Sequence, residues 1–400
     1  MNHKERVAVL FGGRSPEHDV SILTGLQALH AIDNIRYDAF PVYVDMCGQW
    51  WTGDLLREKS IFLPTVEYKD SLESVLLDLK VSQKGVLHFL KKRLFKKTMS
   101  IYFDLALLAF HGLSGENGDI QGTLELANIP YTGVRVMASS IFMDKFLTKE
   151  MLNLKGVPSL PHLLIKKPKE GLLLLPETLQ KICNNLKFPC CIKPRYLGSS
   201  IGVEKVKTPD ELNAALPNIF QYDSYAIVEP FVENLVEYNV SVRKGLKNDI
   251  VLSAIERPKY RKDLLDFKQK YCSYMNLKSG FKSPSIQNFE MLSLTRDISP
   301  KLDQKIIKLI TNYSKITFSF MESTGVPRID FIGNKKTGEI WLNEVNPCPG
   351  SFGYYLWEKA SDPLIFTELL THLLKEAVTQ KKLRSLSSNN VPAVAHLFYR

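Results

Sequence analysis

The sequence has few of the features that mark secreted proteins or metal-cluster proteins. Among its 400 residues are 6 cysteines, and no two of them stand in a CxxC pair. Neither a zinc site nor a disulfide framework is therefore expected. The first apolar run, residues 7–11, is too short for a signal peptide, and no later stretch approaches a membrane span. We expect a cytoplasmic protein without membrane insertion.

Internal repeats and low-complexity tracts are also missing. The composition, 44% hydrophobic and 24% charged, is typical of a globular protein, and the length suffices for two or three domains. The net charge of +10 permits binding to nucleic acids, but no RNP-like aromatic motif accompanies the basic runs. The sequence therefore does not favour a nucleic-acid partner.

Strand and helix patterns alternate along the chain. Residues 7–11 predict a strand that ends in two glycines, after which Ser15 and Pro16 predict the start of a helix. A strand at residues 40–44 completes a βαβ unit, and the continuous apolar run 101–110 predicts one buried strand. We expect further strands at residues 157–165, 188–193, 225–229, 238–242 and 250–256, a helix capped by Ser139 that carries residues 143–145, and helices at 176–185, 302–321 and 365–380. The sequence thus predicts an α/β fold with three lobes.

Residues 328–350 read RIDFIGNKKTGEIWLNEVNPCPG, two apolar runs around a polar segment, which predicts an antiparallel β-hairpin. Side chains alternate along a strand, so Arg328 and Asp330 share one face, as do Glu344 and Asn346. If the register joins these faces, three oxygen ligands and a guanidinium converge, a combination that suits Mg²⁺ with phosphate. Taken alone, the pattern is a weak signal and favours a solvated hairpin carrying scattered charge.

The stretch KPRYLGSSIG, residues 193–202, places Lys193 at the end of a predicted strand before a glycine-serine loop. Such loops offer backbone N–H groups to phosphate oxygens, and the lysine adds charge. The GxxxxGK order of a Walker A motif is absent. By itself the loop is compatible with a plain turn.

Seven local patterns in a fixed order carry a resemblance. They are PEHDVS (16–21), HGLSGENGDIQGTLELANIPYTG (111–133), MDK (143–145), KPRYLGSSIG (193–202), DFKQKY (266–271), RIDF (328–331) and NEVNPCPG (343–350). With these motifs the chain resembles the D-alanine–D-alanine ligases of the ATP-grasp superfamily from residue 7 to about residue 357. The resemblance implies a three-domain α/β ATP-grasp fold: a doubly wound, Rossmann-like substrate-binding domain at 1–137, a central ATP-grasp domain at 138–233, and a C-terminal ATP-grasp domain at 234–400 with the metal and catalytic site and a short polar tail.

The same resemblance implies an enzyme that joins two D-alanines for peptidoglycan synthesis through an acyl phosphate. ATP and D-alanine would be its small-molecule partners, with two Mg²⁺ ions, or Mn²⁺, held by Asp330, Glu344 and Asn346, and a homodimer as its assembly. The implied nucleotide contacts are Lys145, Lys193, Ser200, Glu229, Val232, Glu237 and Lys270. The implied catalytic residues are Glu17, Ser199, Tyr271, Arg328 and Gly350, and the implied substrate contacts are His111 and Tyr355.

Two of these residues also have a purely structural interpretation. Glu17 could be an acid in the first turn of a helix, where it complements the helix dipole. His111 could be a hydrogen-bonded core histidine at the end of a strand. The ordered motifs favour the functional interpretation of both, while Glu116 could orient the same region or only support a loop.

The second substrate is where the sequence departs from the family. Tyr355 stands where the family has a serine that binds the carboxylate of the second substrate, and a phenol ring needs far more room. The segments at 71–97 and after Tyr271 are longer than usual, and the tail after Gln380 is additional. Two alternatives therefore stay open: a related ligase with another amino acid or a hydroxy acid as second substrate, or a nucleotide-binding protein without turnover.

Overall fold

The computed structural model describes residues 4–63, 72–90, 99–259 and 296–388. It divides into two compact units. Unit 1 contains the described residues of Met1–Val136, Gly350–Tyr354 and Leu364–Arg400, and unit 2 contains those of Met137–Pro349 and Tyr355–Pro363. The three-domain boundaries expected from the sequence stay a prediction. No described helix combines the length and hydropathy that crossing a bilayer requires.

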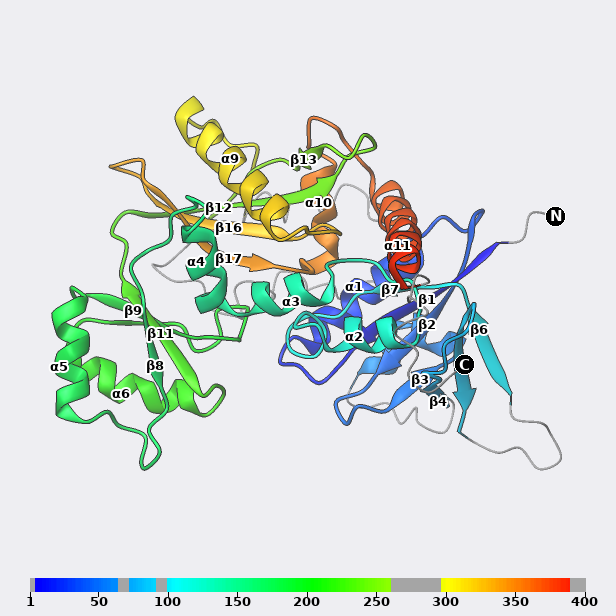
Figure 1. Cartoon of the computed structure of the whole chain (residues 1–400), viewed down its shortest axis with the longest axis horizontal. Coiled ribbons are helices and arrows are strands. Elements are labelled where there is room, and N and C mark those ends of the chain that lie inside the picture. The colour runs from blue at the N-terminus through cyan, green and yellow to red at the C-terminus, as the bar shows by residue number, and fades with distance from the viewer. Residues whose placement is uncertain (1–3, 64–71, 91–98, 260–295, 389–400) are drawn as a thin grey trace, which may run out of the picture. The chain divides into compact units, whose positions relative to one another are not determined.

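Unit 1 is built on a seven-stranded sheet in the order β6-β5-β4-β3-β2-β1-β7. Its strands are β1 Glu5–Gly12, β2 Tyr37–Val44, β3 Trp50–Thr52, β4 Glu73–Leu77, β5 Gly85–Phe89, β6 Ser100–Phe103 and β7 Leu105–Leu108. Its helices are α1 His18–Ala31, α2 Asp119–Leu126 and α11 Phe366–Ser388, with 3-10 turns η1 Asp54–Arg57, η2 Lys59–Phe62 and η3 Gly350–Gly353. Strand β1 pairs in parallel with β2 and β7, so the predicted βαβ unit is confirmed (Figure 1).

Three predictions for unit 1 were wrong in detail. The single strand expected at 101–110 is broken into β6 and β7 at Asp104, whose carboxylate accepts a hydrogen bond from the Arg6 backbone N–H at 2.8 Å. The first helix begins at His18, because the Ser15 hydroxyl accepts the backbone N–H of Glu17 in a turn that precedes it. Helix α11 runs to Ser388, beyond the predicted end at residue 380.

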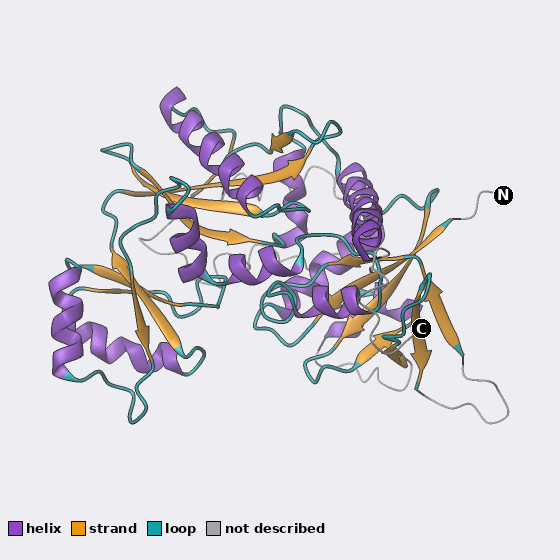
Figure 2. Cartoon of the chain, viewed as in Figure 1, coloured by secondary structure: helices purple, strands orange, loops and turns teal. Residues whose placement is uncertain are grey.

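Unit 2 holds two sheets, which Figure 2 shows as separate sets of strands. One has the order β10-β9-β11-β8, and the other β15-β14-β12-β16-β17 with β13 paired to β12. The first uses β8 Leu163–Lys166, β9 Cys190–Pro194, β10 Glu204–Val206 and β11 Tyr225–Pro230; the second uses β12 Leu235–Lys244, β13 Ile250–Leu252, β14 Glu256–Pro258, β15 Arg296–Ile298, β16 Arg328–Asn334 and β17 Ile340–Asn346.

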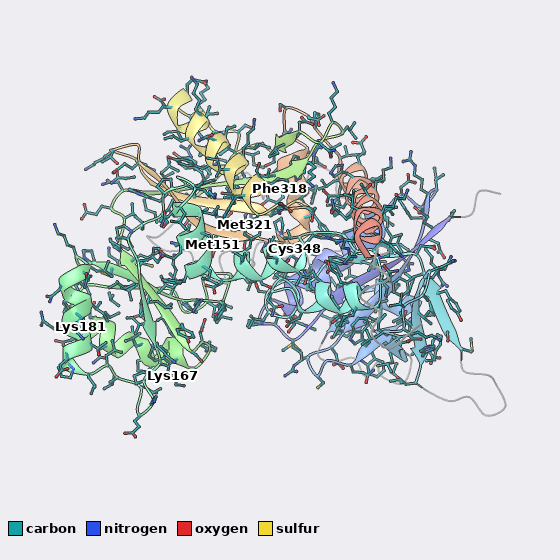
Figure 3. The ribbon with its side chains drawn as sticks, viewed as in Figure 1. Met151, Lys167, Lys181, Phe318, Met321 and Cys348 are labelled. Carbon is teal, nitrogen blue, oxygen red and sulfur yellow. The ribbon has the colours of Figure 1, made fainter. Side chains whose placement is uncertain are left out.

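The helices of unit 2 supply an apolar face to each sheet. They are α3 Val136–Met143, α4 Lys145–Asn153, α5 Pro176–Asn185, α6 Pro209–Phe220, α9 Gln304–Phe320 and α10 Tyr354–Trp357. Residues of α5 and α6 form one core cluster with β8, β9 and β11. Helix α9 contacts β12, β13 and β17, and Figure 3 shows Phe318 and Met321 at its C-terminal end beside this sheet. Both side chains are buried, so α9 covers the sheet that carries the hairpin.

The helix expected around residues 143–145 is divided. Ser139 lies inside α3, and Asp144 caps α4, where its carboxylate accepts the backbone N–H groups of Phe146 and Leu147. Serine and aspartate are comparable caps, but Ser139 lies inside α3, whereas Asp144 stands directly before α4. Lys145 is therefore the first residue of α4.

Candidate active site

The hairpin predicted at 328–350 is the pair β16–β17, and its register joins the two polar faces. Asp330 stands opposite Glu344, and Arg328 stands opposite Asn346. The Arg328 guanidinium donates to both carboxylate oxygens of Asp330, each at 2.7 Å, and the Asn346 amide donates to the same carboxylate at 2.9 Å. The convergence expected from side-chain alternation is present.

A register shift after Asp330 brings one more polar residue to this face. Asp330 pairs with Glu344, but the next residue of β16 pairs with Leu342, so Asn343 is the extra residue of a β-bulge. Both Asn343 and Glu344 line the cleft described below. Strict alternation places Asn343 on the opposite face, which is why the sequence did not predict it.

Arg328 and Asp330 form a largely buried ion pair. Burial opposes the charge of Arg328, but the ion pair with Asp330 outweighs it and holds the pKa of Arg328 well above its ordinary value. The side chains are 18% and 9% exposed. Such a bidentate pair fixes the guanidinium in one orientation.

A cleft in unit 2 gathers most of the predicted nucleotide and metal residues. It is bordered by residues of both sheets and by the start of α4. The predicted residues along it are Lys145, Lys193, Ser200, Glu229, Val232, Glu237, Asp330 and Glu344. Basic, acidic and apolar side chains thus meet in one concave site, as nucleotide binding requires.

Lys145 is positioned by the cap of its helix. The Arg195 guanidinium donates to both oxygens of Asp144, with 2.7 Å from its Nε to Oδ1, and so ties the MDK and KPR motifs together. The Lys145 ammonium donates to the Leu197 carbonyl at 2.6 Å and lies 3.2 Å from the Glu344 carboxylate. This lysine is therefore held between the glycine-serine loop and the hairpin.

The glycine-serine loop itself has an unusual backbone. Ser199 and Ser200 both have positive φ, 55° and 59°. Positive φ is uncommon for serine, so two such residues in succession mark a backbone conformation that the surrounding structure has to hold in place. Ser200 lines the cleft and Ser199 is buried in the loop.

Glu229 lies between two buried lysines. Its carboxylate forms ion pairs with Lys149 and, at 2.6 Å, with Lys193. Burial alone raises the pKa of Glu229, but the two lysines together lower it to about 2. Lys193 also donates to the Asn343 side-chain oxygen at 3.0 Å. The glutamate is thus an ionised acceptor in a fixed position.

Lys149 was not among the site residues predicted from the sequence. It lies on α4, four residues after Lys145, and its side chain is fully buried. Burial lowers its pKa to about 8, against the opposing attraction of Glu229. The signal that could have revealed it is helical spacing, because residues four apart share a face.

Unit 1 brings together Glu17, His111 and the Gly350 segment. His111 shares a hydrogen bond of 2.8 Å with the Thr24 hydroxyl, and the same hydroxyl accepts the backbone N–H of Ser351 at 3.1 Å. Glu17 and His111 are both buried. Helix α1 and the turn after Pro349 therefore form one site.

A glycine is required between these residues. Gly112 has φ of +73°, and a Cβ there would lie 2.7 Å from the Glu17 carboxylate and 2.3 Å from the Ser15 hydroxyl. Its backbone N–H donates to the Glu116 carboxylate at 2.6 Å. The HGLSGE motif thus brings both glutamates to one loop.

Tyr355 lies in unit 2 and is only 3% exposed. Its hydroxyl accepts a hydrogen bond from Arg296 at 2.5 Å and lies 3.4 Å from a Glu256 carboxylate oxygen. Two predicted residues, Lys270 and Tyr271, fall outside the described residues, as does Cys272. The cysteines within the described ranges are free thiols.

The hairpin residues fit a magnesium site. Asp330, Glu344 and Asn346 offer two carboxylates and one amide, all hard oxygen donors. Each carboxylate has a basic side chain beside it: Arg328 pairs with Asp330, and Lys145 pairs with Glu344. Within the described ranges no group of three or more His, Cys, Asp or Glu residues could hold a metal alone. This donor set suits Mg²⁺, which shares its coordination with water and substrate phosphates.

Two family models match the chain. Residues 6–134 match the model for the D-ala D-ala ligase N-terminus, and residues 151–375 match that for the D-ala D-ala ligase C-terminus. The chain belongs to the D-alanine–D-alanine ligase family. The resemblance inferred from the seven motifs is confirmed.

Relatives within the D-alanine–D-alanine ligase family align over nearly the whole chain. The D-alanine--D-alanine ligase of Thermosipho africanus is 33% identical over 379 residues, covering 94% of this chain and 95% of the relative. That of Enterococcus hirae is 31% identical over 387 residues, covering 94% and 96%.

Solved structures of the D-alanine–D-alanine ligase family share the fold. The VanG D-Ala:D-Ser ligase from Enterococcus faecalis matches with a TM-score of 0.72 at 25% identity, covering 94% of this chain and all of that one. The D-alanine-D-alanine ligase from Coxiella burnetii matches with a TM-score of 0.74 at 23% identity, covering 96% and 97%. The expected ATP-grasp fold is therefore confirmed.

Proposed function

We propose that this chain joins two D-alanines to D-alanyl-D-alanine at the expense of ATP, for peptidoglycan synthesis in the cytoplasm. The observation that carries the proposal is the cleft of unit 2, where lysines and oxygen ligands face one another as phosphoryl transfer requires. Membership of the ligase family supports the same activity. The charged residues along this cleft include six that the sequence predicted to contact nucleotide or metal: Lys145, Lys193, Glu229, Glu237, Asp330 and Glu344.

The reaction has two steps. The carboxylate of the first D-alanine attacks the γ-phosphorus of ATP, ADP leaves, and an acyl phosphate forms. The amine of the second D-alanine then attacks the acyl carbon, inorganic phosphate leaves, and the amine loses a proton to complete the amide. The chain's own contribution is positioning and charge stabilisation.

The nucleotide would be held by the cleft residues of unit 2. Lys145 and Lys193 would contact its phosphates, and the Ser200 loop would donate backbone N–H groups to them. Glu229 and Val232 would contact the adenine, and Glu237 the ribose hydroxyls. The fixed, ionised state of Glu229 supports this role, because it accepts hydrogen bonds without first having to lose a proton.

Asp330, Glu344 and Asn346 would hold two Mg²⁺ ions, or Mn²⁺, against the ATP phosphates. The metal supplies positive charge that neutralises the phosphate oxygens during transfer. Arg328, fixed by Asp330, would stabilise the transferring phosphoryl group and the tetrahedral intermediate.

The first D-alanine would be bound by Glu17, whose carboxylate engages its ammonium group, with His111 beside it. Ser199 and the Gly350 backbone N–H would complete its contacts. Lys270 and Tyr271 keep the roles of phosphate and substrate contacts that the resemblance implies. That resemblance also suggests a homodimer, which sedimentation equilibrium would test.

The test is product identification with purified protein, Mg²⁺-ATP and single amino acids. We expect D-alanyl-D-alanine, ADP and phosphate with D-alanine, and no dipeptide with L-alanine. Binding of ATP without any D-alanine product would contradict the proposal. D-serine and D-lactate as second substrates test the alternatives left open by Tyr355.

A further inference from the structure

A row of polar residues crosses the large sheet of unit 2. Asn239 of β12 stands opposite Glu256 of β14 on one side and opposite Asp330 of β16 on the other, and Asp330 stands opposite Glu344 of β17. Four adjacent strands therefore present polar groups at one level. Asp330 and Glu344 have a place in the proposed site, but the proposed chemistry gives Glu256 no role.

Glu256 is fully buried and holds an arginine. Arg296 donates to its carboxylate at 2.7 Å and to the Tyr355 hydroxyl at 2.5 Å. The Tyr355 ring also lies under this guanidinium, with 5.1 Å between the ring centroid and the guanidinium carbon. Asn239 donates to the remaining Glu256 oxygen at 3.4 Å. The buried Glu256 carboxylate and the buried Tyr355 hydroxyl therefore fix the position of the Arg296 guanidinium.

This arrangement repeats the one around Arg328. The Arg296 side chain is 18% exposed over a Glu256 that is 0% exposed, and Arg328 is 18% exposed over an Asp330 that is 9% exposed. In each case the carboxylate is more deeply buried than the guanidinium that it orients. Glu256 and Tyr355 also act electrostatically on Arg328, so the two guanidinium groups lie in one neighbourhood.

The two amino acids of the proposed reaction place different demands on such cations. The carboxylate of the first is consumed as the acyl phosphate, next to the group assigned to Arg328. The carboxylate of the second is not consumed, and it must be held on the side of the molecule away from the attacking amine. A carboxylate that survives the reaction is held most strongly by a charge-assisted hydrogen bond from a cation.

We propose that Arg296 binds the carboxylate of the second amino acid, with Glu256 and Tyr355 as its positioning residues. This inference rests on the proposed function and extends it. Tyr355 then acts through Arg296, since its hydroxyl is engaged with Arg296 and Glu256. The acceptor class is an α-amino acid with a free carboxylate, and the phenol orients the arginine that binds it.

The experiment is a competition between two acceptors at one pH. The enzyme receives Mg²⁺-ATP with equimolar D-alanine and D-alaninamide, which lacks the acceptor carboxylate. Mass spectrometry measures the ratio of D-alanyl-D-alanine to D-alanyl-D-alaninamide. This ratio compares the acceptors only, because both products share the same ATP-dependent first step.

We expect the wild-type ratio to favour D-alanine, and Arg296→Gln to reduce it by about 10- to 100-fold, the range for a hydrogen bond to a charged group. Arg257→Gln is the matched control: Arg257 pairs with Asp297 at 2.6 Å across the same two strands and is 38% exposed. That variant should keep the wild-type ratio. Arg296→Lys, which keeps the charge beside Glu256, should give an intermediate ratio.

An unchanged ratio in Arg296→Gln would overturn the inference. If that variant does not fold, an unchanged ratio in Arg296→Lys would overturn it equally. Failure of the wild-type enzyme to form any D-alanyl-D-alanine contradicts the proposed function itself, so the two failures are distinguishable. A loss of ATP binding in Arg296→Lys would also contradict it, because an acceptor residue has no part in nucleotide affinity.

Discussion

At the scale of single residues, the buried charges at the cleft of unit 2 depend on one another. Glu229 is nearly inaccessible, and only the ammonium groups of Lys149 and Lys193 offset the cost of burying its charge. Removing one member leaves a buried charge with less compensation. Stability is therefore coupled to the proposed nucleotide binding at this group.

Replacing Glu229 with glutamine should lower the free energy of unfolding by about 3 kcal/mol, because the buried ammonium groups of Lys149 and Lys193 lose their carboxylate partner. Urea denaturation followed by circular dichroism measures the change. Lys166→Met, at an exposed position of β8 in the same unit, should stay within about 0.5 kcal/mol of wild type. Equal stability of the two variants would contradict the assigned role of the ion pair between Lys149 and Glu229.

The pH dependence of stability should report the same lysine. The native state holds the pKa of Lys149 at about 8, below the ordinary 10.5 of an unfolded chain. Between these values the unfolded chain binds more protons, so this group's contribution to stability rises with pH and is lost as pH falls through 8. The difference in unfolding free energy between wild type and Lys149→Met should grow by about 3 kcal/mol from pH 7 to pH 10.5. A difference in unfolding free energy that does not vary with pH would contradict the lowered pKa of Lys149.

At the scale of elements, the hairpin β16–β17 shows how far sequence patterns reach. Alternation and a polar turn predicted the strands and the meeting of Asp330 with Glu344, because period two depends only on local backbone geometry. The bulge that turns Asn343 into the cleft depends on pairing between strands, which a sequence pattern does not record. The break at Asp104 also depends on a contact between strands, because a backbone N–H from another strand donates to its carboxylate. The sequence pattern therefore did not predict it.

Asp330→Asn should reduce kcat by about 10²- to 10³-fold, because it removes a metal-binding charge and weakens the hold on Arg328. The Mg²⁺ concentration for half-maximal activity should rise in the same variant. Glu339→Gln is the control, since Glu339 is an exposed acid of the same hairpin and bonds only locally with Thr337. Full activity of Asp330→Asn would be inconsistent with the proposed site.

At the scale of the whole molecule, motifs that are distant in sequence together support the assignment to the ligase family. The motifs at residues 16–21 and 111–133 form one group in unit 1, together with Gly350. Those at 143–145, 193–202, 328–331 and 343–349 form another in unit 2. The order of the motifs sufficed to predict the family, and most of the residues predicted to contact nucleotide or metal line one cleft. Arg296 and Glu256 belong to no motif, and their pairing arises from the antiparallel contact of β14 with β15, so sequence could not indicate it.

The central claim is that the carboxylate of one D-alanine becomes an acyl phosphate before the peptide bond forms. The most direct test supplies D-alanine labelled with ¹⁸O at both carboxylate oxygens, together with unlabelled Mg²⁺-ATP, and analyses the released phosphate by mass spectrometry. The account predicts one ¹⁸O atom in phosphate for each dipeptide made. Dipeptide formation with unlabelled phosphate would contradict it.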